Sequence, residues 1–158
     1  MSVRVQAEDF DVAAELAAVR EAGGGAGGIV TFTGIVRDMA GDRPISSMTL
    51  EHYPGMTVRE LERIEAEAQD RWPLAASRVI HRYGKLFPGD NIVLVITASA
   101  HRQAAFEAAE FLVDWLKTRA PFWKQEATGS GPHWVEAKAS DDDAAARWAA
   151  SPPVARSA

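Results

Sequence analysis

The chain has 158 residues, with 17 basic and 22 acidic side chains and a formal net charge of −5. Its 47% apolar content is enough for a core, which excludes a disordered chain. No apolar run has the length of a membrane span and the first residues lack the features of a signal peptide, so we expect a cytoplasmic protein that does not bind membranes. The acidic balance argues against a nucleic-acid binder but permits a local basic pocket.

The chain contains no cysteine, which restricts its chemistry. A thiolate nucleophile, a persulfide carrier, a disulfide and a cysteine metal site are all excluded. The four histidines lie far apart in the sequence, at His52, His81, His101 and His133. No two of them have the short spacing of ligands on one helix face, so we expect no bound metal and no cofactor.

The first elements are a strand and a helix. Val3 and Val5 alternate with polar residues and predict a short strand. Asp9 or Asp11 can then cap a helix with one apolar face, which Gly23 ends.

A glycine run at 23–28 separates this helix from an apolar, β-branched segment. The run resembles a phosphate-binding loop, but no Lys-Ser/Thr pair follows it and the next element is a strand. We therefore interpret it as a flexible loop. The apolar segment predicts a buried strand at 29–36 that ends beside Arg37, and 38–44 is expected to be a loop rich in turns.

The middle of the chain predicts a strand at 48–53 and then an amphipathic helix that ends near Trp72. Thr57 and Glu60 have the spacing of a capping box at its start. Segments 77–83 and 91–98 then predict a hairpin with a longer loop.

The last third predicts a helix from near Ser99 to before Pro121, followed by a strand pair at 122–127 and 133–138. A short final helix is capped by Ser140, Asp141, Asp142 and Asp143 and ends near Trp148. We predict one domain at 1–150 with a flexible tail at 151–158. The element order contains few uninterrupted βαβ units, which indicates an α+β fold with a mixed, largely antiparallel sheet.

His101 and Arg102 lie at the start of the third predicted helix. Helix N-termini carry unpaired N–H groups and a positive dipole end, where a cation is unfavourable by roughly 0.3–1 kcal/mol. A bound anion such as a phosphate would explain the pair. The alternative is that both residues are merely solvated.

Lysine is rare in this chain: 13 of the 17 basic residues are arginines. Lysine differs from arginine in that it titrates and attacks more readily, so the few lysines are candidates for chemistry. Lys117 and Lys124 flank Pro121. Lys117 alone could simply complement a helix C-terminus, but that explanation does not cover Lys124.

Several segments, in order, resemble the large catalytic subunit of molybdopterin synthase, the MoaE family. The resemblance spans about residues 3–148, and its most specific part is a Lys-x-x-x-Pro-x-Trp-Lys block. The segments are Phe32-Thr33-Gly34-Ile35-Val36-Arg37, Leu50-Glu51-His52-Tyr53, Ile80-His81-Arg82-Tyr83-Gly84, Ala100-His101-Arg102 with Ala105-Phe106, Leu116-Lys117-Thr118-Arg119-Ala120-Pro121-Phe122-Trp123-Lys124 with Glu126, and Trp134-Val135.

The resemblance implies an α/β-hammerhead fold and a homodimer. It also implies a small ubiquitin-like subunit on each protomer, giving a heterotetramer, whose C-terminal Gly-Gly thiocarboxylate enters the active site. The implied reaction is a sulfurtransferase step in molybdenum cofactor biosynthesis. It opens the cyclic phosphate of cyclic pyranopterin monophosphate and inserts two sulfurs as the dithiolene of molybdopterin. A chain without cysteine fits this scheme, because the partner supplies the sulfur.

The resemblance also implies residue roles. Lys117 would stand beside the incoming C-terminus, and Lys124 would act in proton transfer and charge stabilisation. The remaining site residues would hold the pterin phosphate (Arg37, His101 and Arg102), line the pocket (Ile35, Val36, Gln125 and Glu126) or reach across the dimer (Lys138). Two residues depart from the family pattern: Gln125 replaces a residue that is often basic, and Lys138 stands where an arginine is expected, which loses a bidentate phosphate contact.

A non-catalytic module is the alternative. It would bind a phosphorylated metabolite or a ubiquitin-like partner, with its lysines acting only by charge. Turnover of the cyclic pterin with a thiocarboxylated partner distinguishes the two functions.

Overall fold

The computed structural model describes residues 2–129, 131–135 and 139–149. The predicted tail at 151–158, the end of the predicted strand 133–138, and Lys138 lie outside these residues. The helices are α1 (Val12–Ala22), α2 (Met56–Arg71), α3 (Arg102–Thr118) and α4 (Ala139–Ala149). The strands are β1 (Val3–Gln6), β2 (Gly28–Ile35), β3 (Met39–Ala40), β4 (Arg43–His52), β5 (Leu74–Arg82), β6 (Gly84–Leu86), β7 (Asn91–Ser99), β8 (Phe122–Thr128) and β9 (Gly131–Trp134).

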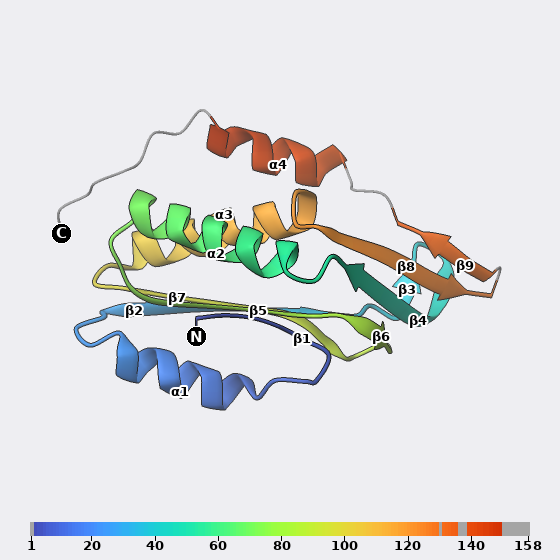
Figure 1. Ribbon diagram of the computed structural model, residues 1–158, viewed down its shortest axis with the longest axis horizontal. Coiled ribbons are helices and arrows are strands. Elements are labelled where there is room, and N and C mark those ends of the chain that lie inside the picture. The colour runs from blue at the N-terminus through green and yellow to red at the C-terminus, as the bar shows by residue number, and fades with distance from the viewer. Residues whose placement is uncertain (1, 130, 136–138, 150–158) are drawn as a thin grey trace.

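The first sheet has the strand order β1-β5-β7-β2. Its β1 and β5 are parallel, while β5 with β7 and β7 with β2 are antiparallel, as the predicted hairpin requires. Helices α2 and α3 lie over one face of this sheet and α1 lies over the other (Figure 1). The prediction of an α+β fold with a mixed, largely antiparallel sheet is confirmed.

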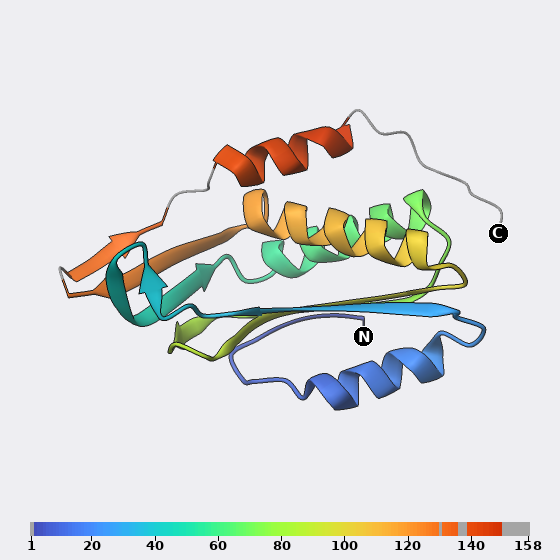
Figure 2. The same ribbon diagram turned by 180° about the vertical axis from the view of Figure 1, so that it is seen from behind.

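The second sheet has the order β3-β4-β8-β9, with β6 paired to β4, and all its pairings are antiparallel. It extends from one end of the first sheet, on the side where α3 ends (Figure 2). The chain runs directly from the C-terminus of α3 into β8, so the end of a helix and the start of a strand meet at the junction of the two sheets.

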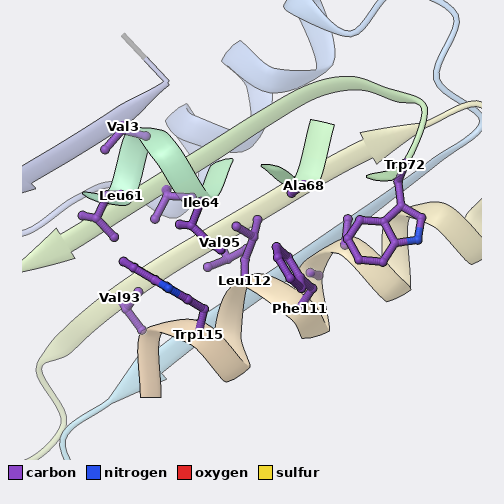
Figure 3. Packing of buried hydrophobic residues seen from close by; sticks show 13 residues of the cluster. Val3, Leu61, Ile64, Ala68, Trp72, Val93, Val95, Phe111, Leu112 and Trp115 are labelled. Atoms are coloured by element: carbon purple, nitrogen blue, oxygen red, sulfur yellow. The ribbon is translucent and has the colours of Figure 1, made fainter. Parts of the chain in front are cut away.

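The main core lies between the first sheet and helices α2 and α3. The apolar face of α3 contributes Leu112 and Trp115, which pack with Leu61 of α2 and Val95 of β7 (Figure 3). Leu61, Val95 and Leu112 are completely buried. Each such side chain contributes roughly 1.5–3 kcal/mol of transfer free energy, which holds α3 against the sheet.

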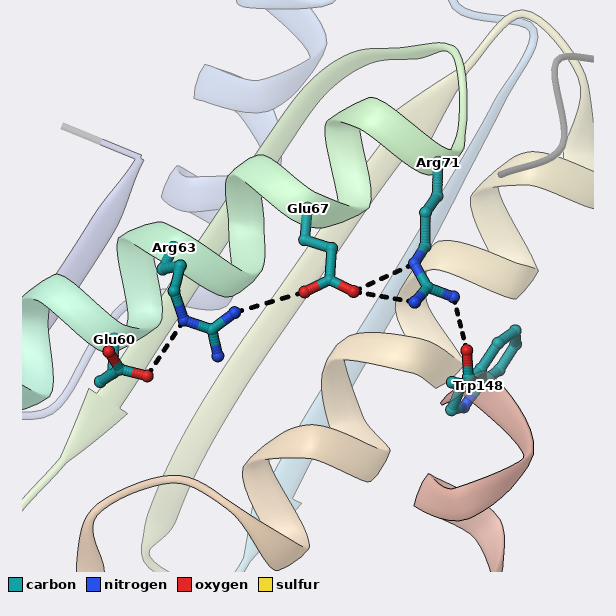
Figure 4. Close-up of polar contacts among 5 residues, drawn as sticks. All are labelled: Glu60, Arg63, Glu67, Arg71 and Trp148. Atoms are coloured by element: carbon teal, nitrogen blue, oxygen red, sulfur yellow. Dashed lines mark hydrogen bonds and ion pairs between the residues drawn. The ribbon is translucent and has the colours of Figure 1, made fainter. Parts of the chain in front are cut away.

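Helix α4 is anchored on the outer side of α2 and α3. The Trp148 ring packs edge-on against Trp72 and Phe111, with centroids 5.5 and 5.6 Å away. Arg71 donates a 2.9 Å hydrogen bond to the Trp148 carbonyl oxygen and forms an ion pair with Glu67 (Figure 4). These contacts hold α4 in place although none of its residues is fully buried.

Two of the predicted helix starts are wrong in detail. Helix α2 begins at Met56 after Gly55, and the Thr57 hydroxyl donates to the Tyr53 carbonyl oxygen at 2.7 Å, so the capping box is absent. Helix α3 begins at Arg102 rather than near Ser99, because Ser99 still pairs with Gly28 in the sheet. By contrast, Asp11 caps α1 as one of the two predicted alternatives, through a hydrogen bond from the Ala14 N–H.

Two predicted loops contain strands. The segment 38–44 holds β3 and the first residues of β4, and the loop between β5 and β7 holds β6, which pairs with β4. The last strand, β9, also begins at Gly131 rather than at His133 and ends at Trp134, while 136–138 of the predicted range lie outside the described residues. Each of these strands depends on a partner segment elsewhere in the chain, which a local pattern of alternation does not reveal.

The glycine run lies where the chain turns from α1 into β2. A side chain at Gly27 would place its Cβ 2.2 Å from the Ala100 carbonyl oxygen, whereas a Cβ at Gly24 would meet nothing within 4 Å. Gly27 therefore permits close packing of this turn against the segment that precedes α3.

The substitution Gly27→Ala should lower the free energy of unfolding by about 1–3 kcal/mol, the usual cost of forcing extra volume into a packed site. Urea denaturation measures this difference. Gly24→Ala is the matched control and should change stability much less. Equal stability of the two variants would contradict the packing role of Gly27.

Candidate active site

A cavity of about 410 Å³ lies where α3 ends and the two sheets meet. Its walls come from the end of β2, from β4, β5, β7, β8 and the last turns of α3, with single residues after β9 and in α4. The polar and charged residues that line it are Arg37, His81, Lys117, Thr118, Lys124, Glu126 and Asp141.

Lys117 and Lys124 both line this cavity, although one is helical and the other is in a strand. Lys117 is exposed in the last turn of α3 and makes no ion pair or hydrogen bond with any described residue. Pro121 follows, and the backbone turns there, with the Phe122 N–H bonded to the Ala120 carbonyl oxygen at 2.8 Å. This turn brings Lys124 back to the cavity that Lys117 faces.

Lys124 and Glu126 project from the same face of β8, because residues two apart in a strand share a face. The Lys124 Nζ lies 3.7 Å from the Glu126 Oε1, and the side chains are 33% and 9% exposed. Their partners in β4 are Leu50 and Met48, which line the same cavity. The result is a partly buried ion pair beside apolar side chains of β4.

Gln125 lies between these two residues and faces the other side of β8. It pairs with Thr49 and Trp134 and is not among the residues that line the cavity. The structure therefore does not bring Gln125 to the cavity. The alternation of the strand is the physical reason.

Ile35, Val36 and Arg37 form the wall at the end of β2. The backbone groups of Val36 are already engaged, because its N–H bonds to the Asp90 carbonyl oxygen and its carbonyl oxygen accepts from the Gly89 N–H, both at 2.9 Å. The Val36 side chain is buried, while Arg37 is exposed. Arg37 therefore places a cation at this side of the cavity.

His101 and Arg102 lie at the opposite end of α3. Fifteen residues separate Arg102 from Lys117, which corresponds to about 22 Å along a helix axis. Both residues are exposed, and His101 precedes the helix without making a side-chain cap. A single chain therefore does not bring them together with Arg37. Lys138, the remaining predicted residue, lies outside the described part of the chain.

His81 is a cavity residue to which the sequence assigned no role. It lies in β5, is only 6% exposed and stacks on Phe122 at a centroid distance of 3.7 Å and an interplanar angle of 17°. Its Nδ1 donates to the Arg82 carbonyl oxygen at 2.8 Å, since a carbonyl can only accept. Burial, with smaller contributions from the charges of His52 and Lys117, lowers the pKa of His81 to about 4, although the hydrogen bond to Arg82 acts in the opposite direction. The imidazole is therefore neutral near pH 7.

The cavity combines three cationic side chains with two carboxylates in a chain of net charge −5. Among the described residues, no three potential ligands come close enough to hold a metal ion. None of the helices that the structure describes is both long and apolar enough to cross a membrane. An α+β protein with such a cavity is suited to bind an anionic substrate next to groups that move protons.

Comparison with known proteins gives the family. The MoaE protein family model matches residues 5–119. The chain is 57% identical over 152 residues to a molybdopterin synthase catalytic subunit from Mesorhizobium japonicum, covering 95% of this chain and 94% of the relative. The chain belongs to the MoaE family, as its sequence motifs predict.

Solved structures agree with this assignment. A molybdopterin biosynthesis MoaE protein from Burkholderia ambifaria is 47% identical, with a TM-score of 0.80 over 95% of this chain and 99% of that one. A complex of subunits 1 and 2 of the molybdopterin-converting factor from Helicobacter pylori contains a chain of the same fold. That chain is 21% identical, with a TM-score of 0.71 over 86% of this chain and 91% of the other.

The low pKa of His81 predicts a loss of stability in acid. The unfolded chain takes up a proton on this histidine near pH 6.5, whereas the folded chain does so only near pH 4. The free energy of unfolding should therefore fall with pH across this window, by up to about 3 kcal/mol from His81 alone. Urea denaturation from pH 7 to pH 4 should show a shallower fall for His81→Phe. Parallel curves for the two proteins would contradict the prediction.

Proposed function

We propose that this protein is the sulfurtransferase that converts cyclic pyranopterin monophosphate into molybdopterin. The observation that carries this proposal is the convergence of Lys117 and Lys124 on one cavity. Both the phosphate of the substrate and the thiocarboxylate that donates sulfur are anions. A cavity with three cations inside an acidic protein offers them a local positive site.

The two lysines have different surroundings and suit different roles. Lys117 is exposed and has no described partner, so its ammonium is available to an incoming carboxylate or thiocarboxylate terminus. Lys124 is half-buried beside Glu126, which holds the ammonium over the cavity floor. Lys124 is therefore placed to stabilise developing negative charge and to transfer a proton during sulfur addition.

The sulfur donor in this proposal is a small ubiquitin-like subunit with a C-terminal Gly-Gly thiocarboxylate. This chain has no cysteine and hence no thiol of its own to carry sulfur. The related fold in the Helicobacter pylori complex occurs together with a second subunit of the converting factor. The proposed assembly is a homodimer of this chain that binds two small subunits, without nucleic acid or membrane.

The phosphate site in this proposal requires two copies of the chain. Arg37 lines the cavity, but His101 and Arg102 lie about 22 Å from Lys117 along α3. In a twofold dimer, one copy can present these two residues to the cavity of the other. The proposal includes no resident metal or cofactor, and it places the reaction in the cytoplasm, in keeping with the biosynthetic role that the relatives' names give.

Alanine at Lys117 or at Lys124 should abolish dithiolene formation while leaving thermal unfolding nearly unchanged. The assay supplies the cyclic pterin and the thiocarboxylated partner and measures molybdopterin. Lys85→Ala is the matched control, because Lys85 lies in β6 outside the cavity and its loss should leave turnover intact. Lys124→Arg should also be inactive, because a guanidinium does not release its proton at neutral pH.

The same assay distinguishes this enzyme from a non-catalytic binding module. Turnover at the wild-type rate by either alanine variant would remove the lysines from the mechanism. A wild-type protein that binds the pterin and the partner but forms no dithiolene would instead be the non-catalytic module.

The two-copy phosphate site predicts complementation between inactive variants. Arg102→Ala and Lys117→Ala should each be inactive alone. The two variants are then unfolded and refolded together in equal amounts, so that half of the dimers contain one copy of each. One of the two sites in such a mixed dimer is intact, so the mixture should recover about a quarter of the wild-type activity. Lys117→Ala mixed with Lys124→Ala should recover none, because both lysines belong to the same copy. Absence of recovery in the first mixture would contradict a site shared between copies.

A further inference from the structure

His81 has one ring nitrogen that is not used by the fold. Its Nδ1 carries a hydrogen that is donated to the Arg82 carbonyl oxygen, so the neutral ring keeps its lone pair on Nε2. Nε2 has no hydrogen-bond partner among the described residues, and it is not a buried, sealed atom. His81 lines the cavity, so its ring can meet a ligand there.

The ring is also held rigidly. Phe122, the first residue of β8, stacks on it at 3.7 Å, and β5 is paired on both sides, with Val5 and Val93 opposite His81. A basic nitrogen is thus fixed on the cavity wall by two strands, a stacked ring and a hydrogen bond. A group that is already held in place can act on a substrate without a further cost of orienting it.

Atom balance in the proposed function requires a water molecule. When a thiocarboxylate gives up its sulfur, an oxygen must replace that sulfur on the terminal carbon of the partner. Water supplies this oxygen after the sulfur has bonded to the pterin and links it to the partner as a thioester. Attack by water is efficient only if a neighbouring group takes its proton.

We propose that the Nε2 of His81 is the base that activates this water. The water oxygen bonds to the terminal carbonyl carbon, and one of its protons moves to Nε2. The carbon–sulfur bond then breaks with its electron pair going to the sulfur, which stays on the pterin. The partner leaves with a terminal carboxyl group that loses its own proton to solvent, and no oxidation occurs. This inference rests on the proposed function.

Other groups around the cavity are less suited to this role. Glu126 is already engaged in the ion pair with the Lys124 ammonium. Asp141 is contributed by α4, which has no fully buried residue. The titratable groups around His81 come from β4, α3, β8, α4 and the end of β2, and they are His52, Lys117, Lys124, Glu126, Asp141 and Arg37.

The bound ligands adjust the basicity of His81. Burial, with a smaller contribution from neighbouring charges, keeps the ring neutral, with a pKa of about 4. A substrate phosphate and a thiocarboxylate add negative charge beside it, and an opposite charge favours the protonated imidazole. The base therefore becomes stronger when the reactants are in place.

The test uses the complete complex of the chain with its thiocarboxylated partner and the cyclic pterin. His81→Gln should lower kcat by roughly 10²- to 10⁴-fold, the usual contribution of a general base, with KM changed by less than about threefold. Intact-mass analysis should show a partner–pterin thioester that accumulates. The wild-type kcat should fall toward acid pH as His81 becomes protonated, and this acid limb should be absent in the variant.

His52→Gln is the matched control. His52 also packs against Phe122, at a centroid distance of 5.8 Å, but it does not line the cavity. His52→Gln should turn over within about twofold of the wild type and accumulate no thioester, because His52 is outside the cavity and is not the base that activates the water. A thioester in both variants, or wild-type kcat in His81→Gln, would overturn the inference.

A measurement on the unaltered protein covers the case in which His81→Gln does not fold. Nitrogen NMR of the imidazole at pH 7 should show hydrogen on Nδ1 and a lone pair on Nε2, and a hydrogen on Nε2 would overturn the proposal. Failure of the proposed function looks different, since the wild-type complex itself would then form no dithiolene.

Discussion

The turn at Pro121 is the constraint on which the site depends. Proline cannot continue α3, and the residue before it is excluded from helical geometry, so the chain leaves the helix soon after Lys117. It then enters β8, whose pairing with β4 directs Lys124 and Glu126 to the same cavity. In an unbroken helix, the two lysines would be two turns apart along one face, about 10 Å along the axis, with no strand to direct either one. Because of this turn, Lys117 and Lys124 line the same cavity.

Packing of the core makes this turn rigid. Helix α3 is held by buried residues such as Leu112 and Trp115, and β8 is held by its pairing with β4 and β9. The stack of His81 on Phe122 joins the first sheet to the second at the same point. The cavity is thus bounded by elements that contact one another, which suits a site that must hold reacting groups close together.

Electrostatics explain why an acidic chain can serve anionic reactants. The net charge of −5 is spread over the whole molecule, whereas Arg37, Lys117 and Lys124 are gathered around one cavity. Burial keeps His81 neutral there, so it adds an acceptor and no further positive charge. Cations for binding and a neutral base for proton transfer can therefore coexist within the same walls.

The sequence by itself determined the helical segments and the hairpin, and it was enough to single out two lysines as candidates. Helical periodicity and the Asp11 cap are local, and the rarity of lysine directed attention to Lys117 and Lys124. Only the tertiary structure decided that β3 and β6 pair with β4, that Gln125 faces away from the cavity, and that Arg102 lies far from Lys117. The place of His81 on the cavity wall also emerged only there. Strand pairing and cavity walls bring together residues that are distant in the sequence. Local patterns do not show which distant residues become neighbours.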